Sequence, residues 1–510
     1  MNLFLRGDII KSLFKAVAVL SFFSILSRCL SFVFRVILSR QVTTVELGIY
    51  SVAVSICSIF VTLLTAGIPL TISRKTAEYT VDKNKNATNK TVSAGITIAL
   101  FLSVFVITFV LCFKGFFKLI FADMQSYTVI LTLIPFMVFS AIYAPIRGYM
   151  WGKEQYTKVS IVELIEQILK LVLCLVLFSL GFSNNNLPAG LAISLACFLS
   201  SVVGIVFFIK DGGRFVSPQG FVLPAVKTIA PLMAVRVAGS LLQPLISIVL
   251  PLMLVSAGFS STQALSQLGI VLGMTFPLIT IPTTLVGSLA MALVPKLSIM
   301  QKENQMHKLQ TQVYNSLSFT LFCCFMFLPI FSALGEPICL ILFKNTEAGV
   351  YLSLFAWLVL PMGISQITSS VLNSLGHEKF VFFSNAISAI FIVLSIFILP
   401  KYVGIYSILI GMGLQTGIVS VINLIKIKKL IGYPSQISLY VKYLIISVLL
   451  FLFNHWAIAP LSFVWGNFIA LIICGLLSVI YFVVLSYCFN LVNLEILTCK
   501  FKKNDKKQNT

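Results

Sequence analysis

Long, continuous apolar segments dominate this chain and restrict what it can fold into. Of its 510 residues 59% are hydrophobic and only 10% are charged. A helix needs about 20 mostly apolar residues to cross a bilayer. Runs this long form helices, because only helices and closed barrels satisfy the backbone in lipid. We therefore predict an all-α integral membrane protein with about 14 transmembrane helices, at residues 14–38, 45–72, 92–113, 127–150, 160–181, 187–209, 226–255, 267–295, 313–333, 348–371, 382–400, 404–425, 439–458 and 463–489.

The first apolar segment could be mistaken for a secretory signal peptide. However, Arg28 and Arg35 interrupt it, no small-residue cleavage site follows, and thirteen further segments come after it. We therefore interpret residues 14–38 as the first membrane span.

Basic residues are distributed unevenly between the two sides of the predicted spans. With the N-terminus inside, 27 of the 36 Lys and Arg residues fall on the cytoplasmic side. Such an asymmetry is typical of multi-pass proteins. It predicts a protein of a bacterial cytoplasmic membrane with both termini in the cytoplasm. Because the net charge of +21 is spread over short loops, we expect no nucleic-acid partner; lysines in the run Lys500–Lys507 would instead contact membrane lipids.

Residues that could carry catalysis or hold a metal are scattered. The eleven cysteines lie mostly in apolar spans without metal-ligand spacing, and the three histidines are far apart in the sequence. No loop contains a nucleophile motif or a pair of acids. We therefore expect no metal, no cofactor and no enzymatic activity.

A short motif recurs within the chain. Residues 151–156 (WGKEQY) follow the fourth predicted span, and residues 375–380 (LGHEKF) follow the tenth. Parallel repeats of this kind usually enclose a substrate site. The recurrence predicts two six-helix lobes, followed by a helix pair and a basic cytoplasmic tail, at residues 1–212, 213–430, 431–490 and 491–510.

Six charged residues lie inside the apolar segments. A charge at the centre of a bilayer costs at least ~2.5 kcal/mol and normally faces a wet cavity or a partner. An internal polar path, and hence a transport function, is indicated by Arg28, Arg35, Glu163, Glu166, Lys170 and Arg236.

Two sets of polar residues recur at i, i+4, i+7 and i+11, which places each set on one face of a helix. We predict that the two faces line a cationic cleft that binds a diphosphate, because the planar fork of arginine suits phosphate oxygens. Alternatively, Arg28 and Arg35 extend to the membrane surface or form interhelical ion pairs. The first stripe comprises Ser24, Arg28, Ser31 and Arg35, and the second stripe comprises Arg236, Ser240, Gln243 and Ser247.

The fifth predicted span carries Glu163, Glu166, Gln167 and Lys170 within about 100° of its circumference. Glu166 and Lys170 are spaced i, i+4 and can pair on their own helix. The alternative is a coupling site, in which an acid takes up a proton or Na⁺, or pairs with an arginine of the cleft in one conformation only.

Three motifs resemble one transporter family. They are residues 64–79 (LTAGIPLTISRKTAEY), Arg147-Gly148-Tyr149 with Gly152 and Glu166-Gln167, and Ile281-Pro282 through Pro295. Together they resemble polysaccharide transporters of the stage V sporulation protein B type. These transporters belong to the multidrug/oligosaccharidyl-lipid/polysaccharide (MOP) exporter superfamily.

This resemblance implies a flippase that moves a polyprenyl-diphosphate-linked saccharide across the cytoplasmic membrane by alternating access. It also implies glycosyltransferases and a polymerase of the same pathway as partners. Lipid II flippases of the superfamily often carry an Arg-Asp pair in the first span, where this chain has Phe34-Arg35. The saccharide, a peptidoglycan precursor or a polysaccharide repeat unit, therefore stays open.

Two other functions remain as alternatives. A multidrug exporter of the same superfamily would prefer an acid-lined cavity for organic cations, whereas the polar spans carry three arginines against two acids. A membrane-embedded glycosyltransferase would need a large outer loop with carboxylates, and the predicted outer loops are short.

Overall fold

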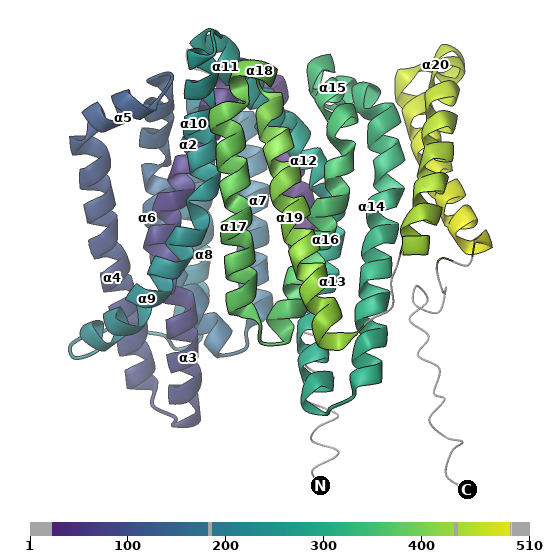
Figure 1. Ribbon diagram of the computed structural model, residues 1–510. Coiled ribbons are helices and arrows are strands. Elements are labelled where there is room, and N and C mark those ends of the chain that lie inside the picture. The colour runs from purple at the N-terminus through teal and green to yellow at the C-terminus, as the bar shows by residue number, and fades with distance from the viewer. Residues whose placement is uncertain (1–22, 182–185, 433–436, 490, 492–510) are drawn as a thin grey trace, which may run out of the picture. The chain divides into compact units, whose positions relative to one another are not determined.

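The computed structural model describes residues 23–181, 186–432, 437–489 and 491. Within these ranges the regular elements are all helices, which confirms the all-α prediction (Figure 1). Residues 14–22 of the first predicted span and all but one residue of the predicted tail 491–510 lie outside the described ranges.

The chain divides into two compact units, of which the first contains residues up to Met274 together with Val393–Ile408. It opens with a helix over residues 23–41. The further elements of this unit are α2 (Thr44–Thr65), α3 (Ile68–Val81), α4 (Lys85–Cys112), α5 (Lys114–Ile120), α6 (Gln125–Gly152), α7 (Tyr156–Ser179), α8 (Asn186–Lys210), α9 (Val222–Ser240), α10 (Leu242–Ser256), α11 (Ser261–Gly269), nearly all of the π-helix η1 (Ile270–Thr275), and α18 (Pro400–Val403).

The second unit contains Thr275–Ile392 and the residues from Leu409 onward. Its elements are α12 (Phe276–Ile279), α13 (Ile281–Lys302), α14 (Met306–Phe343), α15 (Thr346–Phe355), the short 3₁₀-helix η2 (Ala356–Leu358), α16 (Val359–Ser374), most of α17 (Glu378–Ile398), most of α19 (Tyr406–Ile431), and α20 (Ile437–Cys488). The predicted lobe boundary between residues 212 and 213 stays a prediction.

Twelve helices of the described chain are long and apolar enough to cross a membrane. The predicted number of fourteen is therefore not established. Two predicted spans are outside this set: 14–38, of which residues 14–22 lie outside the described ranges, and 160–181, which carries clustered charges. The second of them is α7, whose 24 residues are long enough to cross a bilayer but include four Lys and Glu residues.

Glycine breaks one long span between α2 and α3. Thr43 and Glu46 start α2 with a capping box, and the span turns at Gly67, whose φ is +82°. A Cβ atom on Gly67 would also lie 3.0 Å from the Ile229 carbonyl oxygen of α9. Pro69 follows in the first turn of α3, where its missing N–H is tolerated. This explains the glycine and the proline of the motif at residues 64–79.

Two glycines let α6 pack closely on α3. A Cβ atom on Gly148 would lie 2.7 Å from the Pro69 carbonyl oxygen, and one on Gly152 would lie 2.5 Å from that of Ser73. Both distances are shorter than a real contact permits, so the positions admit only glycine at this spacing. The glycines of the second motif therefore serve helix packing.

In the second unit, α20 bends at Gly466 into two spans, Ser438–Val464 and Gly466–Cys488, at the place predicted for the terminal helix pair. The Tyr443 ring stacks on Phe325 of α14 and on Phe482, with ring centroids 5.7 and 5.8 Å apart. Ser478 donates a hydrogen bond of 2.5 Å to the Asn454 side chain, which joins the two arms. Aromatic packing thus holds α20 on α14.

Candidate functional site

The helix over residues 23–41 exposes both arginines of the first stripe. Ser24 and Ser31 of the same stripe are half-buried, whereas Phe34 is buried. Arg35 donates from Nη1 to the backbone oxygen of Leu272 in η1 at 3.4 Å. A guanidinium within an apolar helix is costly in lipid unless water or a polar partner surrounds it.

The side chain of Gln167 connects this helix to α7. Its Oε1 atom accepts hydrogen bonds from Ser31 Oγ at 2.8 Å and from Lys170 Nζ at 2.5 Å. The Lys170 ammonium also lies 4.8 Å from the centre of the Phe34 ring. The structure thus brings together residues that the sequence analysis had placed in two separate sites, and we name the polar seam Arg28, Ser31, Arg35, Gln167 and Lys170.

The expected ion pair between Glu166 and Lys170 does not form in the described part of the chain. Lys170 bends back by one turn toward Gln167, because the Phe34 ring and the Gln167 oxygen lie together on the side of the neighbouring helix. Glu166 instead accepts a weak hydrogen bond of 3.4 Å from Ser200 Oγ of α8.

Glu163 has a partner that sequence reasoning missed. Its carboxylate lies 3.7 Å from Arg147 Nη1, and the guanidinium stacks over the Trp151 ring at 5.1 Å. Arg147 lies inside α6 and within the predicted span 127–150, but it was not among the six charges expected inside the apolar segments. Its place in the Arg147-Gly148-Tyr149 motif was the feature of the sequence that could have marked it as a candidate site residue. Ser200 was missed as well, since a serine in an apolar span carries no charge to mark it.

The second stripe does not keep to one helix face. The helix is interrupted at Leu241, between α9 and α10. Arg236 and Gln243 are exposed, but Ser247 is buried and donates a hydrogen bond of 2.8 Å to Ser55 of α2. The predicted common face is therefore wrong for Ser247.

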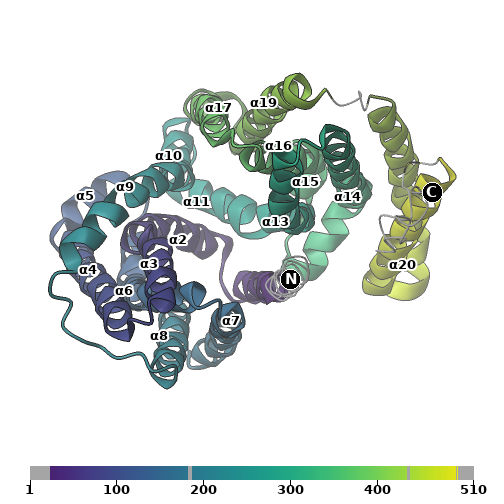
Figure 2. The same ribbon diagram turned by 90° about the horizontal axis from the view of Figure 1, so that it is seen from below.

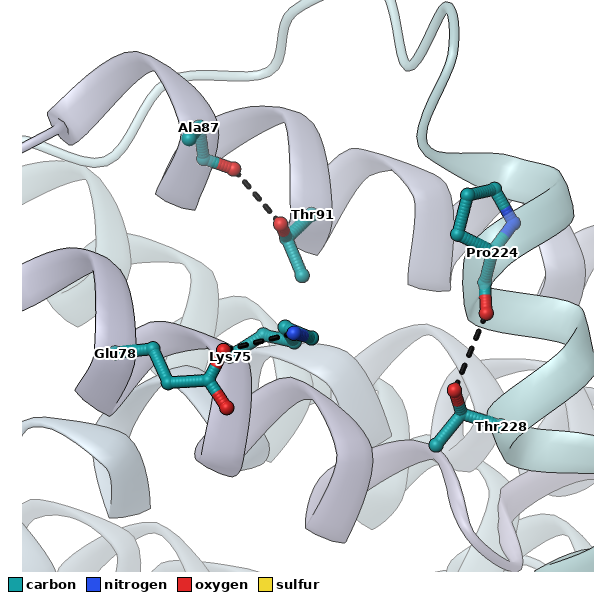
Figure 3. A network of polar contacts seen from close by, with 6 residues as sticks. All are labelled: Lys75, Glu78, Ala87, Thr91, Pro224 and Thr228. Atoms are coloured by element: carbon teal, nitrogen blue, oxygen red, sulfur yellow. Dashed lines mark hydrogen bonds and ion pairs between the residues drawn. The ribbon is translucent and has the colours of Figure 1, made fainter.

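Packing places α9 away from the polar seam. It lies against α2, α3 and α4, and Figure 2 shows α9 and the helix over residues 23–41 on different sides of α2. Figure 3 shows where α3, α4 and α9 meet, near the Lys75–Glu78 ion pair of 2.7 Å on α3. On α9 itself, Thr228 donates to the Pro224 oxygen at 3.2 Å. Arg236 thus sits on a helix that packs outside the seam.

The seam is suited to an anion. It presents three cationic side chains, two of them exposed, among neutral hydrogen-bonding groups. Arginine and lysine are the side chains that bind phosphate oxygens. In the described residues no group of three or more His, Cys, Asp or Glu side chains is placed to hold a metal ion.

Sequence comparison identifies relatives of this chain. The profile of the polysaccharide biosynthesis protein family matches residues 13–301. Stage V sporulation protein B of Bacillus subtilis (strain 168) is 23% identical over 65% of this chain and 66% of its own length. Sporulation protein YkvU of the same organism is 22% identical over 83% of this chain and 94% of its own length.

Two solved structures share the fold. The inward closed conformation of the lipid II flippase MurJ matches with a TM-score of 0.69 and 16% identity, covering 94% of this chain and all of that one. An inward-facing multidrug resistance MATE family transporter matches with a TM-score of 0.66 and 13% identity. The match covers 79% of this chain and 94% of that one. The family match spans more than half of the chain, so this multi-pass membrane protein belongs to the polysaccharide biosynthesis protein family.

Proposed function

We propose that this protein flips a polyprenyl-diphosphate-linked saccharide across a bacterial cytoplasmic membrane by alternating access, with both of its termini in the cytoplasm. Arg28 and Arg35, two turns apart on one helix, hold the diphosphate. Arg236, with Ser240 and Gln243 near it in sequence, contacts the substrate head group outside the seam. The saccharide is a peptidoglycan precursor or a polysaccharide repeat unit made by glycosyltransferases of the same pathway.

The exposed arginines on an otherwise apolar helix carry this proposal. Neither has a carboxylate within 4 Å among the described residues, so a negative partner is missing from their surroundings. A charged side chain in a membrane helix normally marks a substrate or ion path. A diphosphate supplies the missing charge and the oxygen geometry that a guanidinium fork binds.

The acids of α7 fit a coupling role. Glu163 pairs with Arg147 and Glu166 accepts only a long hydrogen bond from Ser200. Glu166 therefore is the group that takes up a proton or Na⁺ when the transporter changes state, while Glu163 stays with its arginine.

A multidrug exporter is the second candidate function. It is favoured by the fold shared with a multidrug resistance transporter over 79% of this chain. Glu166 would then be the acid that attracts an organic cation, and the exposed arginines would oppose such a substrate.

Transport in proteoliposomes separates these two functions. The assay compares a polyprenyl-diphosphate-linked saccharide, the same saccharide diphosphate without the polyprenyl chain, and an organic cation such as ethidium. We expect transport of the lipid-linked compound alone, because its apolar tail must stay in the bilayer while the head group crosses. The Glu166→Gln variant should transport the same substrate without responding to an imposed ion gradient.

Transport of ethidium in place of the lipid-linked compound would move the assignment to the multidrug exporters. Efficient transport of the tail-less diphosphate would exclude a flippase as well. Truncation after Leu430 tests the role of α20, because it removes this helix and keeps every residue of the seam. The truncated protein should lose transport of the lipid-linked compound if α20 guides the polyprenyl chain.

A further inference from the structure

Lys170 is a cation held only by neutral groups. Its ammonium donates to the Gln167 amide oxygen at 2.5 Å and lies 4.8 Å from the centre of the Phe34 ring. Neither contact neutralises the charge, although a ring face attracts a cation. No carboxylate of the described chain lies within 4 Å of this nitrogen, so its charge stays available for an anion.

The position of Lys170 is fixed relative to the first stripe. Ser31, which shares the Gln167 oxygen with Lys170, lies between Arg28 and Arg35 on the helix. The two arginines are about 10 Å apart along the axis, because each residue rises 1.5 Å. Lys170 therefore approaches the stripe near Ser31, which lies between the two arginine positions in the helix.

The charges around Lys170 leave a surplus of positive charge. Glu166 on the same helix attracts it, and Arg35 repels it. The seam thus carries three cations, Arg28, Arg35 and Lys170, whereas the acid that acts on Lys170 is Glu166, which itself accepts a hydrogen bond from Ser200. Uncompensated cations in a membrane protein are costly unless a ligand or water offsets them.

We propose that Lys170 binds the second phosphate group of the substrate and makes the transporter selective for diphosphate over monophosphate linkages. This inference rests on the proposed flippase function. A diphosphate diester carries one negative charge on each phosphate, whereas a monophosphate diester carries a single one. Two arginines two turns apart suffice for one phosphate, and the cation between them holds the other.

The donor geometry of Lys170 supports this role. An ammonium group has three N–H donors, of which Gln167 takes one. The hydrogen bond and the Phe34 ring together hold the nitrogen in place, so little side-chain entropy is lost when a phosphate binds. Gln167 and Phe34 thereby act as positioning residues for Lys170, without touching the substrate.

Selectivity between two substrates is the decisive measurement. Purified protein in proteoliposomes is given the same saccharide on the same polyprenyl chain, linked through either one or two phosphates. We expect the unaltered protein to flip the diphosphate form at least about tenfold faster, because a charged hydrogen bond is lost with the monophosphate. Lys170→Met should slow the diphosphate form about tenfold and change the monophosphate form less than about twofold.

Matched variants separate binding from folding. Lys170→Arg keeps the charge and should keep most of the selectivity, while Lys170→Gln provides a second neutral variant if the methionine variant yields little protein. Lys158→Met removes a lysine from the same helix, but one that pairs with Asp211 at 2.5 Å outside the seam. It should leave the ratio of the two transport rates unchanged.

An equal loss of both substrates in Lys170→Met would overturn the inference, since it would indicate a role in coupling or in helix packing. Equal rates for the two substrates with unaltered protein would overturn it as well. Failure of the unaltered protein to flip either lipid would instead refute the proposed function on which the inference rests.

Discussion

The two polar stripes have the same spacing in the sequence but reach different surroundings. In the first, Ser31 bonds to Gln167 and Arg35 to the Leu272 oxygen, so the stripe joins a polar network. In the second, Arg236 is exposed while Ser247 turns inward to Ser55. One stripe therefore belongs to the polar seam, and the other is divided between the surface and the packing interface with α2.

Helix continuity explains the difference. A periodic pattern places residues on one face only if the helix runs through it without a break. The first stripe lies in an uninterrupted helix over residues 23–41. The second crosses Leu241, where α9 ends, in a stretch that also contains Pro231, Gly239 and Pro244. Proline and glycine at this density interrupt the register that the spacing assumes.

Removing an arginine of the first stripe should have the largest effect. We expect Arg28→Ala and Arg35→Ala each to lower flipping of the diphosphate-linked lipid about 100-fold, because each deletes a charged contact to phosphate. Lysine at either position should restore part of the rate, since it keeps the charge without the bidentate fork. The measurement is flipping in proteoliposomes, with the amount of folded protein determined by size-exclusion chromatography. Rates near normal in both alanine variants would show that the first stripe is not a substrate site.

Much of the fold follows from the sequence because hydrophobic runs of this length have few alternatives. The breaks inside the spans are harder to predict. The π-helix at Ile270–Thr275 supplies the Leu272 oxygen that Arg35 contacts, and nothing in residues 270–275 distinguishes a π-helix from an α-helix.

Side-chain direction limited the prediction of the site. The spacing of Glu166 and Lys170 allowed an ion pair, but Lys170 forms a hydrogen bond with Gln167 instead. That hydrogen bond depends on Phe34 and Ser31, which belong to another helix. Arg147 lies at the end of an apolar run, where hydropathy alone does not separate a span from a loop. Its ion pair with Glu163 depends on how α6 and α7 pack.

An alanine at Arg236 should have a smaller effect than one in the first stripe. We expect Arg236→Ala to lower flipping roughly three- to tenfold, because α9 packs outside the seam and its arginine makes a more solvated contact. The double variant Arg28→Ala with Arg236→Ala tests independence of the two positions. If the two reductions in flipping rate multiply in the double variant, the arginines make separate contacts. If the double variant flips no more slowly than Arg28→Ala alone, both arginines act on one phosphate group.

Ser247→Ala should change stability rather than transport. The variant loses the buried hydrogen bond to Ser55, and interhelical hydrogen bonds in membrane proteins contribute about 0.6 kcal/mol on average. Thermal unfolding in detergent should show a slightly lower midpoint, with the flipping rate unchanged. Ser55→Ala should give a similar loss, and the double variant little more. A clear loss of flipping at normal stability would return Ser247 to the substrate-facing stripe.

The smallest effect is expected at Ser240, the last residue of α9. Its hydroxyl donates to the Val237 oxygen of the same helix at 2.9 Å, so it needs no partner elsewhere. Ser240→Ala therefore removes a local contact at a helix end and should alter neither unfolding nor flipping beyond experimental error. Ser31→Ala is the matched substitution in the first stripe, and it deletes a bond to another helix. We expect Ser31→Ala to slow flipping severalfold because Gln167 loses one of its two donors and Lys170 its fixed position. Equal behaviour of the two serine variants would mean that the contact between Ser31 and Gln167 contributes nothing to the site.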